Sequence, residues 1–220
     1  MDVIGAGQRD AHTRKVRSEA LLSAWGVPIN PALPTLESET NTRLRPVAEI
    51  VSRVLALCYV ALLGQPDNAF ALDFLDQRYD IQPKLTANER VLATKHPLTQ
   101  VERDDASWRY EAMGVLLWIL GALRELPDPV DEIDARMLVA LIKPHTESDL
   151  IASAKPRQLA HIVDAADVHY RCLWAVRDAH LHGRPSAGNL NPMVVSQRLY
   201  AFNWAIQYQN RPWDDVIIDT

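Results

Sequence analysis

The prolines and glycines of this chain fall between segments whose apolar residues recur every three or four positions. Such spacing is typical of amphipathic helices, and no long segment alternates apolar and polar residues as a half-buried strand does. With 220 residues, of which 48% are hydrophobic, the chain is long enough to bury one sizeable core. We therefore predict an all-α fold, a single compact globule of about seven to nine helices.

A proline-rich segment near the N-terminus interrupts the helical pattern. The first helix covers about Ala11–Trp25 and ends at Gly26, because glycine accepts the left-handed conformation that often closes a helix. In the next segment, Val27–Leu36, a proline recurs at every third position, which favours extended backbone. A ligand for a proline-recognition domain is one interpretation. We prefer an extended strap that lies over the helices and buries Ile29, Leu33 and Leu36.

The middle of the chain contains a series of shorter periodic segments. Pro46 fits the first turn of a helix that ends at Gly64. Thr86 and Glu89 form a capping-box pattern, in which each side chain satisfies a free N–H group at a helix start. In the helix over residues 68–79 we expect the inward side chains to be Phe70, Phe74 and Leu75. The predicted helices cover residues 46–64, 68–79, 86–95, 99–124 and 131–143, with a turn or two at 148–154.

Composition excludes several classes of protein. The formal net charge is −5, the pI is about 5.8 and the basic residues are scattered, so we expect no nucleic-acid partner. No apolar run reaches the roughly 20 residues that cross a bilayer, and residues 1–17 lack the apolar core of a signal peptide. Cys58 and Cys172 lie within apolar helical patterns. We expect a cytoplasmic protein with a flexible N-terminus over residues 1–10 and a single helical domain over residues 11–220.

The helix predicted over residues 156–182 carries two rows of side chains. One row is apolar, and Arg177 continues it onto the same face. Asp167 and Arg171 stand four residues apart with the acid first, which favours an ion pair. They belong to a second row, on the flank of the apolar one, that consists of Asp164, Asp167, Arg171, Trp174 and Asp178.

The last helix and the residues after it each contain apolar side chains that need a covering surface. The helix begins at Asn191-Pro192, where asparagine caps the N-terminus and proline fits the first turn. Trp204 lies opposite the inward stripe of this helix, so it needs a second layer to cover it. The chain then ends with Trp213–Thr220, whose apolar centre needs a surface to lie against. A tail that folds back over Trp204 satisfies both requirements.

Separated tryptophan motifs carry a family resemblance. They are the string Tyr170–Arg177, the string Ala201–Trp204, the ending Trp213-Asp214-Asp215 to Asp219-Thr220, and the central Trp108–Ala112 with Leu117–Gly121. Arg14-Lys15 with Pro31 to Pro34 adds a similar N-terminal segment. Together they resemble the bacterial domain-of-unknown-function family 4272 over nearly the whole chain. The resemblance implies a bacterial single-domain protein of the same helical fold. It implies no activity, because the family has no assigned reaction.

The late tryptophans, arginines and acids suggest a candidate binding site. Aromatic faces beside guanidinium groups are common in recognition sites. The hypothesis is a ligand or partner pocket lined by Trp174, Trp204 and Trp213 and fixed by Arg171, Arg177, Asn203, Asp214 and Asp215. The structural alternative is that Arg177 and Glu111 pair with each other or with tail carboxylates, because an unpaired buried charge is costly.

No motif for catalysis or for a cofactor is present. Asp214, Asp215 and Asp219 lack the turn glycine of a calcium loop, and the histidines have no zinc-site spacing, so we expect no metal. We also find no nucleophile elbow and no phosphate-binding loop, and we expect no cofactor.

The function that we expect is a non-catalytic protein-binding module. Its partner would present a basic surface to this acidic chain, as an immunity or antitoxin-like protein or another accessory protein would require. The alternative is a small-ligand binder or enzyme with a cleft formed by Glu111, Arg171, Arg177 and Asp214. The sequence leaves the oligomeric state open.

Overall fold

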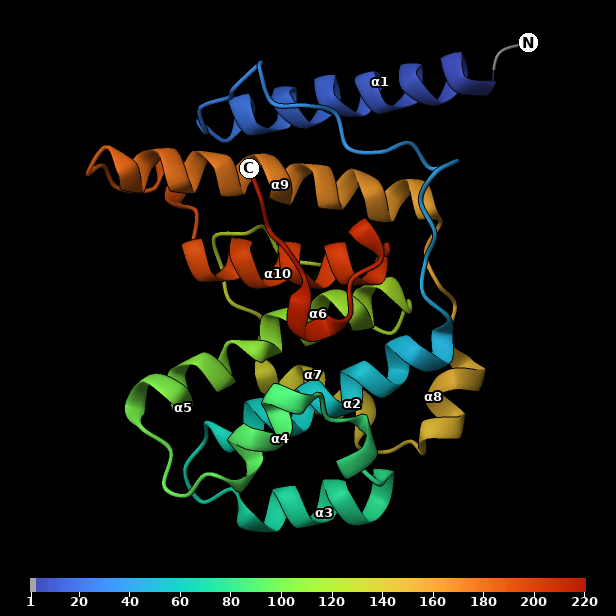
Figure 1. Cartoon of the computed structure of the whole chain (residues 1–220), viewed down its shortest axis with the longest axis vertical. Coiled ribbons are helices and arrows are strands. Elements are labelled where there is room, and N and C mark those ends of the chain that lie inside the picture. The colour runs from blue at the N-terminus through green and yellow to red at the C-terminus, as the bar shows by residue number, and fades with distance from the viewer. Residues whose placement is uncertain (1–2) are drawn as a thin grey trace.

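The fold is all-α, as predicted. A computed structural model describes the backbone of residues 3–220 and the side chains from Asp10 onward, and within these residues it contains helices and no strand (Figure 1). Within the same residues, no helix combines the length and the hydropathy that crossing a membrane requires.

Five helices form a stack that determines the shape of the molecule (Figure 1). From one end, α1 (Val3–Ala24) lies along α9 (Leu159–Leu181), and α10 (Pro192–Ala205) packs beneath α9. Next come α6 (Arg109–Ile119), which packs against α10, and α2 (Val47–Leu63), which packs against α6. Residues far apart in the sequence therefore meet along the stack.

Shorter helices surround α2 at the other end of the molecule (Figure 1). Four of them, α3, α4, α5 and α8, pack on α2, while α7 packs on α6. The α-helices are α3 (Ala69–Tyr79), α4 (Ala87–Thr94), α5 (Gln100–Ser107), α7 (Ala135–Ile142) and α8 (Glu147–Ser153). Single 3-10 turns are η1 (Gln82–Lys84), η2 (Ala187–Asn189), η3 (Tyr208–Asn210) and η4 (Trp213–Asp215).

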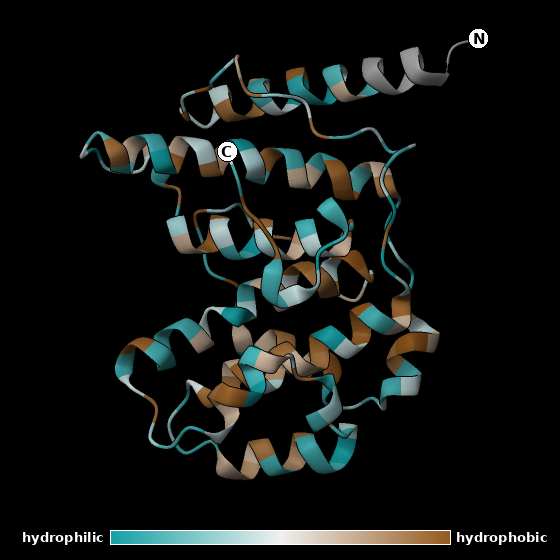
Figure 2. Cartoon of the chain, viewed as in Figure 1, coloured by the Kyte–Doolittle hydropathy of each residue, from teal (hydrophilic) through white to brown (hydrophobic). Residues whose placement is uncertain are grey.

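Two apolar clusters hold the stack together. The larger one is built on α2 and α6, which are apolar on most sides and lie at the centre of the molecule (Figure 2). Its members from α10 are Ala201, Phe202, Trp204 and Ala205. The smaller cluster joins α1, α9 and α10 through Leu22, Val27, Cys172, Leu173, Ala175, Val176, Leu190, Val195 and Leu199.

Helix ends follow the capping chemistry of the sequence. The capping box of Thr86 and Glu89 is confirmed: the Thr86 hydroxyl accepts from the Glu89 N–H at 3.2 Å, and the Glu89 carboxylate accepts from the Thr86 N–H at 2.9 Å. Asn191 caps α10, with its side-chain oxygen 3.0 Å from the N–H of Met193. Gly26, just beyond α1, has a φ of 70°.

The N-terminal helix starts earlier than the sequence indicated. Of the segment predicted to be flexible, residues 1 and 2 lie outside the described residues. Helix α1 begins at Val3, before the expected start at Ala11. The division into a flexible N-terminus over residues 1–10 and a domain over residues 11–220 stays a prediction.

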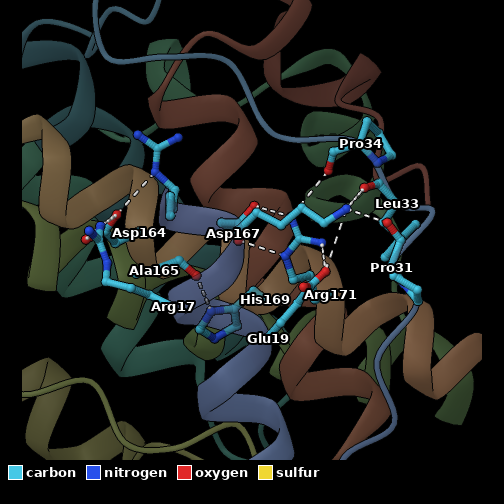
Figure 3. A network of polar contacts seen from close by, with 12 residues as sticks. Arg17, Glu19, Pro31, Leu33, Pro34, Asp164, Ala165, Asp167, His169 and Arg171 are labelled. Atoms are coloured by element: carbon cyan, nitrogen blue, oxygen red, sulfur yellow. Dashed lines mark hydrogen bonds and ion pairs between the residues drawn. The ribbon is translucent and has the colours of Figure 1, made fainter. Parts of the chain in front are cut away.

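Between α1 and α2 the chain contains no helix, and polar contacts attach it to α1 (Figure 3). The Lys15 ammonium donates to the carbonyl oxygens of Pro31 and Leu33, each at 2.6 Å. Leu33 is buried and Leu36 is half-buried, but Ile29 is 41% exposed and does not join the buried side as expected.

The predicted long helix over residues 99–124 is two helices. Helix α5 ends at Ser107 and α6 begins at Arg109, so Trp108 forms a break between them. The two helices have different surroundings, since α5 buries only Ala106 whereas α6 is buried along most of its length. Helix α6 ends at Ile119, before Gly121, whose φ of 78° is left-handed.

Two further details of the middle region differ from the sequence analysis. The helix expected from residue 131 starts at Ala135, because Asp134 accepts from the Arg136 N–H at 2.8 Å and so caps it there. Phe70 on α3 is 85% exposed and not inward, whereas Leu75 on the same helix is buried.

Candidate functional site: an acidic cavity beside Trp213

The C-terminal tail crosses α10 and reaches α9 (Figure 1). Asn203 of α10 donates from Nδ2 to the Ile217 carbonyl oxygen at 2.8 Å. Arg177 of α9 donates to the Ile218 carbonyl oxygen at 2.7 Å and to the Thr220 hydroxyl at 3.0 Å. Asn203 and Arg177, both candidate site residues from the sequence, therefore hold the tail in place.

The tail also covers Trp204, as its sequence position required. Trp204 and Trp213 meet edge to face with their ring centroids 5.3 Å apart, and both are buried. The Tyr200 hydroxyl donates to the Trp213 carbonyl oxygen. Arg45 places its guanidinium 4.7 Å from the centre of the Trp204 ring and donates from Nε to the Trp204 carbonyl at 2.8 Å.

Arg171 and Trp174 lie in a different part of the molecule. Arg171 donates to both oxygens of Asp167 at 2.8 and 3.0 Å, which confirms the predicted pair, and it approaches Glu19 of α1 at 3.5 Å (Figure 3). It also donates to the Pro34 carbonyl at 3.3 Å. Trp174 packs against the smaller cluster, whereas Trp204 and Trp213 belong to the larger one. The three predicted tryptophans therefore do not line one pocket.

Both carboxylate oxygens of Glu111 accept hydrogen bonds inside the fold. Its Oε2 accepts from Nε of Arg198 at 2.7 Å, and its Oε1 accepts from the Ile133 N–H at 2.7 Å. Both side chains of the pair are buried. The partner of Glu111 is thus Arg198 of α10 and not Arg177, which instead binds the tail.

Trp213 and Asp214 line a cavity of about 280 Å³ between α4, α5, α10 and η4, which we call the acidic cavity. Asp215, the next residue, is exposed and does not line it. Four carboxylates and one guanidinium are among its lining residues, and Arg53 and Lys95 pair with two of these carboxylates, so a small negative charge remains. The lining consists of Val60, Asn88, Glu89, Leu92, Glu102, Asp105, Ala106, Arg109, Tyr200, Trp213 and Asp214.

A buried ion pair lies behind one wall of the acidic cavity. Arg53 of α2 donates from Nη2 to Glu89 Oε2 at 2.6 Å, and the side chains are 5% and 8% exposed. The Arg53 guanidinium also lies 5.0 Å from the centre of the Trp213 ring. Burial lowers the pKa of Arg53, and the neighbouring Glu89 carboxylate opposes this shift.

This ion pair leaves hydrogen-bonding capacity unused. Glu89 Oε2 accepts both from Arg53 and from the Thr86 N–H, but Glu89 Oε1 has no hydrogen-bond partner within the described residues. Nε of Arg53 has none there either. Each partner of this ion pair therefore keeps one buried polar atom without a hydrogen bond within the described residues.

Glu102, one of the residues that line the acidic cavity, keeps its negative charge over a wide pH range. A hydrogen bond from the Lys95 ammonium, together with those from Thr99, lowers the pKa of Glu102 to about 2. Asp214 Oδ2 accepts from the Asn88 N–H at 3.2 Å, which ties η4 to the first turn of α4. Arg109 is engaged elsewhere, since it donates to Gln197 at 3.1 Å.

Tyr200 completes the aromatic part of the wall. Its ring meets that of Trp213 edge to face at 5.0 Å between centroids. Burial raises the pKa of its phenol, so the hydroxyl stays neutral and donates to the tail.

The thiols and the described acidic and histidine side chains do not form a reactive or metal-binding cluster. Among the described residues, no group of three or more His, Cys, Asp or Glu side chains is arranged to hold a metal ion. Burial raises the pKa of Cys58 and of Cys172 to about 12, which keeps both thiols protonated. The carboxylates of the acidic cavity are therefore spread around it and not gathered on one point.

Sequence reasoning found only part of this site. It selected Trp213 and Asp214, but it missed Arg53, Glu89 and Asp105. Glu89 was assigned to its capping box, which accounts for only one of its oxygens. An available signal was Arg53, an arginine in the middle of the apolar helix over residues 46–64, since a charge at such a position requires a buried partner.

Comparison with known proteins identifies the family. A family model described as a domain of unknown function (DUF4272) matches residues 14–216. The chain belongs to this family. The DUF4272 match includes every residue that lines the acidic cavity, as well as Arg53. No match is found among curated proteins or among solved structures.

Proposed function

We propose that this DUF4272 protein is a non-catalytic binding module that holds a protein partner through the partner's basic side chains. The observation that carries the proposal is the acidic cavity, whose lining contains the carboxylates of Glu89, Glu102, Asp105 and Asp214. Asp105 and Asp214, two of these carboxylates, would attract a positively charged side chain of a partner.

Charge supports the same class of partner. The chain has a formal net charge of −5, and Asp105 and Asp214 add two carboxylates to the rim of the cavity. A negative surface speeds the approach of a basic protein and disfavours acidic ones. We therefore expect association with a basic partner to become slower as the salt concentration rises, because salt screens the charges.

The alternative function is an enzyme with a cleft formed by Glu111, Arg171, Arg177 and Asp214. The contacts of these residues favour the binding role instead. Glu111 pairs with Arg198, and Arg171 pairs with Asp167, so both charges are satisfied internally. An enzyme would need these ionisable groups to converge on one substrate.

A bacterial, cytoplasmic protein of this kind would act by occupying a partner, as an immunity or antitoxin-like protein does. In that role, the chain would cover a basic active site or a basic nucleic-acid-binding face of a toxin. An accessory protein of an assembly would use the same contact.

The test compares two double variants that each remove two negative charges. D105N/D214N changes the acidic cavity, while D10N/E37Q changes an exposed residue of α1 and an exposed residue whose carbonyl binds Arg14 of α1. Partners captured from the native host by the wild-type chain would be purified, and their Kd values measured with all three proteins at low and moderate salt. The proposal expects about tenfold weaker binding for D105N/D214N only, since one charged hydrogen bond is worth roughly that factor.

Two results would count against the proposal. One is a partner that binds D105N/D214N and the wild-type chain equally well. The other is the absence of any partner that binds the purified wild-type chain directly.

A further inference from the structure

We infer that a second cavity, at the end of α10, binds a small uncharged planar ring with an amide-like edge, the chemistry of a pyrimidine base. This cavity, which we call the amide cavity, has a volume of about 170 Å³. It lies where the segment between α1 and α2 passes the start of α9 and the end of α10 (Figure 1). It shares no lining residue with the acidic cavity, so binding at one site does not require binding at the other.

Side-chain amides are the commonest polar groups in the lining of this cavity. They belong to Asn41, in the segment before α2, and to Asn203, Gln207, Gln209 and Asn210, at the end of α10 and in η3. Each amide presents N–H donors and a carbonyl acceptor in one plane. Among the described residues, the side-chain amides of Asn41, Gln207 and Asn210 form no hydrogen bond. They are therefore available to a ligand that carries both donors and acceptors.

Asn203 contributes the most enclosed of these amides. It is 7% exposed, and its Nδ2 donates to the Ile217 carbonyl oxygen at 2.8 Å, which fixes the orientation of the amide. Its Oδ1 has no hydrogen-bond partner within the described residues, yet it is not sealed from solvent, as the unpaired atoms of Arg53, Glu89 and His169 are. An otherwise buried side chain of the lining therefore keeps a free and accessible acceptor.

The backbone of this wall is strained where the amides stand. Gln207, directly after the last residue that caps α10, has a φ of 56°, and Gln209 and Asn210 have φ values of 53° and 49°. Glycine is the usual residue in this left-handed conformation, because it adopts the conformation without strain. Strained residues of this kind cluster at ligand-binding sites. Three amides at positions that suit glycine therefore indicate that their side chains have a use.

Charge and size select the class of ligand. The lining contains one carboxylate, Glu37, and one guanidinium, Arg43, both exposed, so the cavity favours neither a cation nor an anion. Leu36, Val163 and Ile206 add apolar surface for the face of a ring. A cavity of about 150 Å³ holds one benzene ring, so this cavity suits a single six-membered ring.

The geometry of an amide favours a planar ring over a sugar. A pyrimidine base carries N–H and C=O groups side by side on one edge, and an amide can pair with such an edge through two parallel hydrogen bonds. A sugar hydroxyl rotates and gains less from a fixed donor–acceptor pair. Tyr208, which also lines the cavity, adds an aromatic ring of the type on which bases stack.

The experiment titrates the full chain with uracil, 1,3-dimethyluracil and D-glucose. The dimethyl compound keeps the ring and both carbonyls of uracil but lacks its two N–H donors. Calorimetry measures the Kd, and the side-chain amide NMR signals of Asn41 and Gln207, assigned with the variants N41A and Q207G, locate the ligand. We expect saturable binding of uracil, at least about tenfold weaker binding of 1,3-dimethyluracil, and no binding of glucose.

Matched variants test the wall itself. N41A removes an exposed amide and should weaken uracil binding about fivefold. Q207G should weaken it by a similar factor without lowering the melting temperature, because glycine relieves the left-handed backbone. Q77A, which removes an exposed amide from α3, should leave the Kd unchanged. Asn203 stays unchanged, because it also holds the tail through Ile217.

Four results would overturn this site. They are the absence of saturable uracil binding, equal binding of uracil and 1,3-dimethyluracil, tighter binding of glucose than of uracil, and the same uracil Kd for the wild-type protein, N41A and Q207G. A weaker uracil Kd for Q77A would also overturn it, because the effect would not be local. None of these results affects the proposed function, since the D105N/D214N test concerns other residues.

Discussion

Arg198 of α10 donates from Nε to Oε2 of Glu111 on α6 at 2.7 Å, with side chains that are 0% and 3% exposed. The same pair organises the loop between α6 and α7. Arg198 also donates to the carbonyl oxygens of Pro127 at 2.5 Å and Asp131 at 2.9 Å, and Glu111 accepts from the Ile133 N–H at 2.7 Å. One ion pair therefore links the two helices and fixes the path of the chain that follows α6.

Replacing Glu111 with glutamine is expected to destabilise the protein severely. The variant keeps the shape of the side chain but leaves the Arg198 charge buried without its counter-ion. Breaking a buried pair in this way typically costs about 3 to 5 kcal/mol. Urea unfolding followed by circular dichroism measures the loss as a lower midpoint with an unchanged slope.

The double variant E111L/R198M is the control for this prediction. Apolar replacement of both partners removes the unpaired charge, so we expect it to be more stable than E111Q alone. A double variant that is less stable than E111Q would show that the hydrogen bonds to the loop matter more than the charge balance.

Stability should depend on pH through His169. This ring is buried between α9 and α10, with its centre 5.2 Å from that of Phe202 and its Nδ1 2.8 Å from the Ala165 carbonyl oxygen. Burial is the main cause that lowers its pKa from 6.5 to about 4, and the positive charge of Arg198 adds to it. Between these values the unfolded chain binds more protons than the folded one, so the free energy of unfolding falls as the pH falls.

The full effect corresponds to roughly 3 kcal/mol, developed between pH 6.5 and about 4. Urea unfolding at several pH values measures it. The variant H169L should lose this component of the slope, whereas H182Q, at an exposed position, should keep it. Identical slopes for the wild-type protein and H169L would contradict the prediction.

Local sequence patterns predicted the helices and part of the tail, because both depend on neighbouring residues. Helical spacing identified α2, α9 and α10, and Trp204, which had no inward face, required the covering tail that Trp213 provides. The same reasoning could not separate α5 from α6 at Trp108, since the periodicity continues through the break.

The buried charges were harder to assign, because their partners are distant in the sequence. Asp167 and Arg171 stand one helical turn apart, and their pairing followed from the spacing. Arg198 and Glu111 are separated by 87 positions, and Arg53 and Glu89 by 36, so only the tertiary fold determines which charges meet. The acidic cavity was missed for the same reason.

Two glycines with the same backbone conformation should respond differently to alanine. Gly121 and Gly183 have φ values of 78° and 62°. An added Cβ at Gly121 would lie 2.5 Å from the Lys155 carbonyl oxygen, whereas at Gly183 nothing lies within 4 Å. We expect G183A to cost about 1 to 2 kcal/mol from the left-handed backbone alone. G121A should cost about 1 to 3 kcal/mol more, because the Lys155 backbone must move.

Thermal unfolding of the two variants side by side measures the difference. Because both substitutions change the unfolded chain in the same way, the comparison isolates the contact with Lys155. Equal melting temperatures would mean that the segment after α8, which contains Lys155, moves freely away from Gly121.

Arg177 should control how firmly the tail is held. Its guanidinium binds the Ile218 carbonyl and the Thr220 hydroxyl, so R177A removes two of the contacts that join the tail to the helices. Each such hydrogen bond contributes about 1 kcal/mol, so local opening of the tail should become roughly fivefold or more frequent. Carboxypeptidase digestion, followed by intact mass spectrometry, would then remove the last residues faster from R177A.

The matched control is R184A, because Arg184 pairs with Asp178 near the end of the same helix and, among the described residues, forms no hydrogen bond or ion pair with the tail. Digestion of R184A should match that of the wild-type protein. Since the Asn203 and Tyr200 contacts remain in R177A, cleavage should stop before Trp213. Cleavage through Trp213 would instead mean that Arg177 supports the whole tail, and an unchanged rate would mean that the Asn203 contact alone holds it.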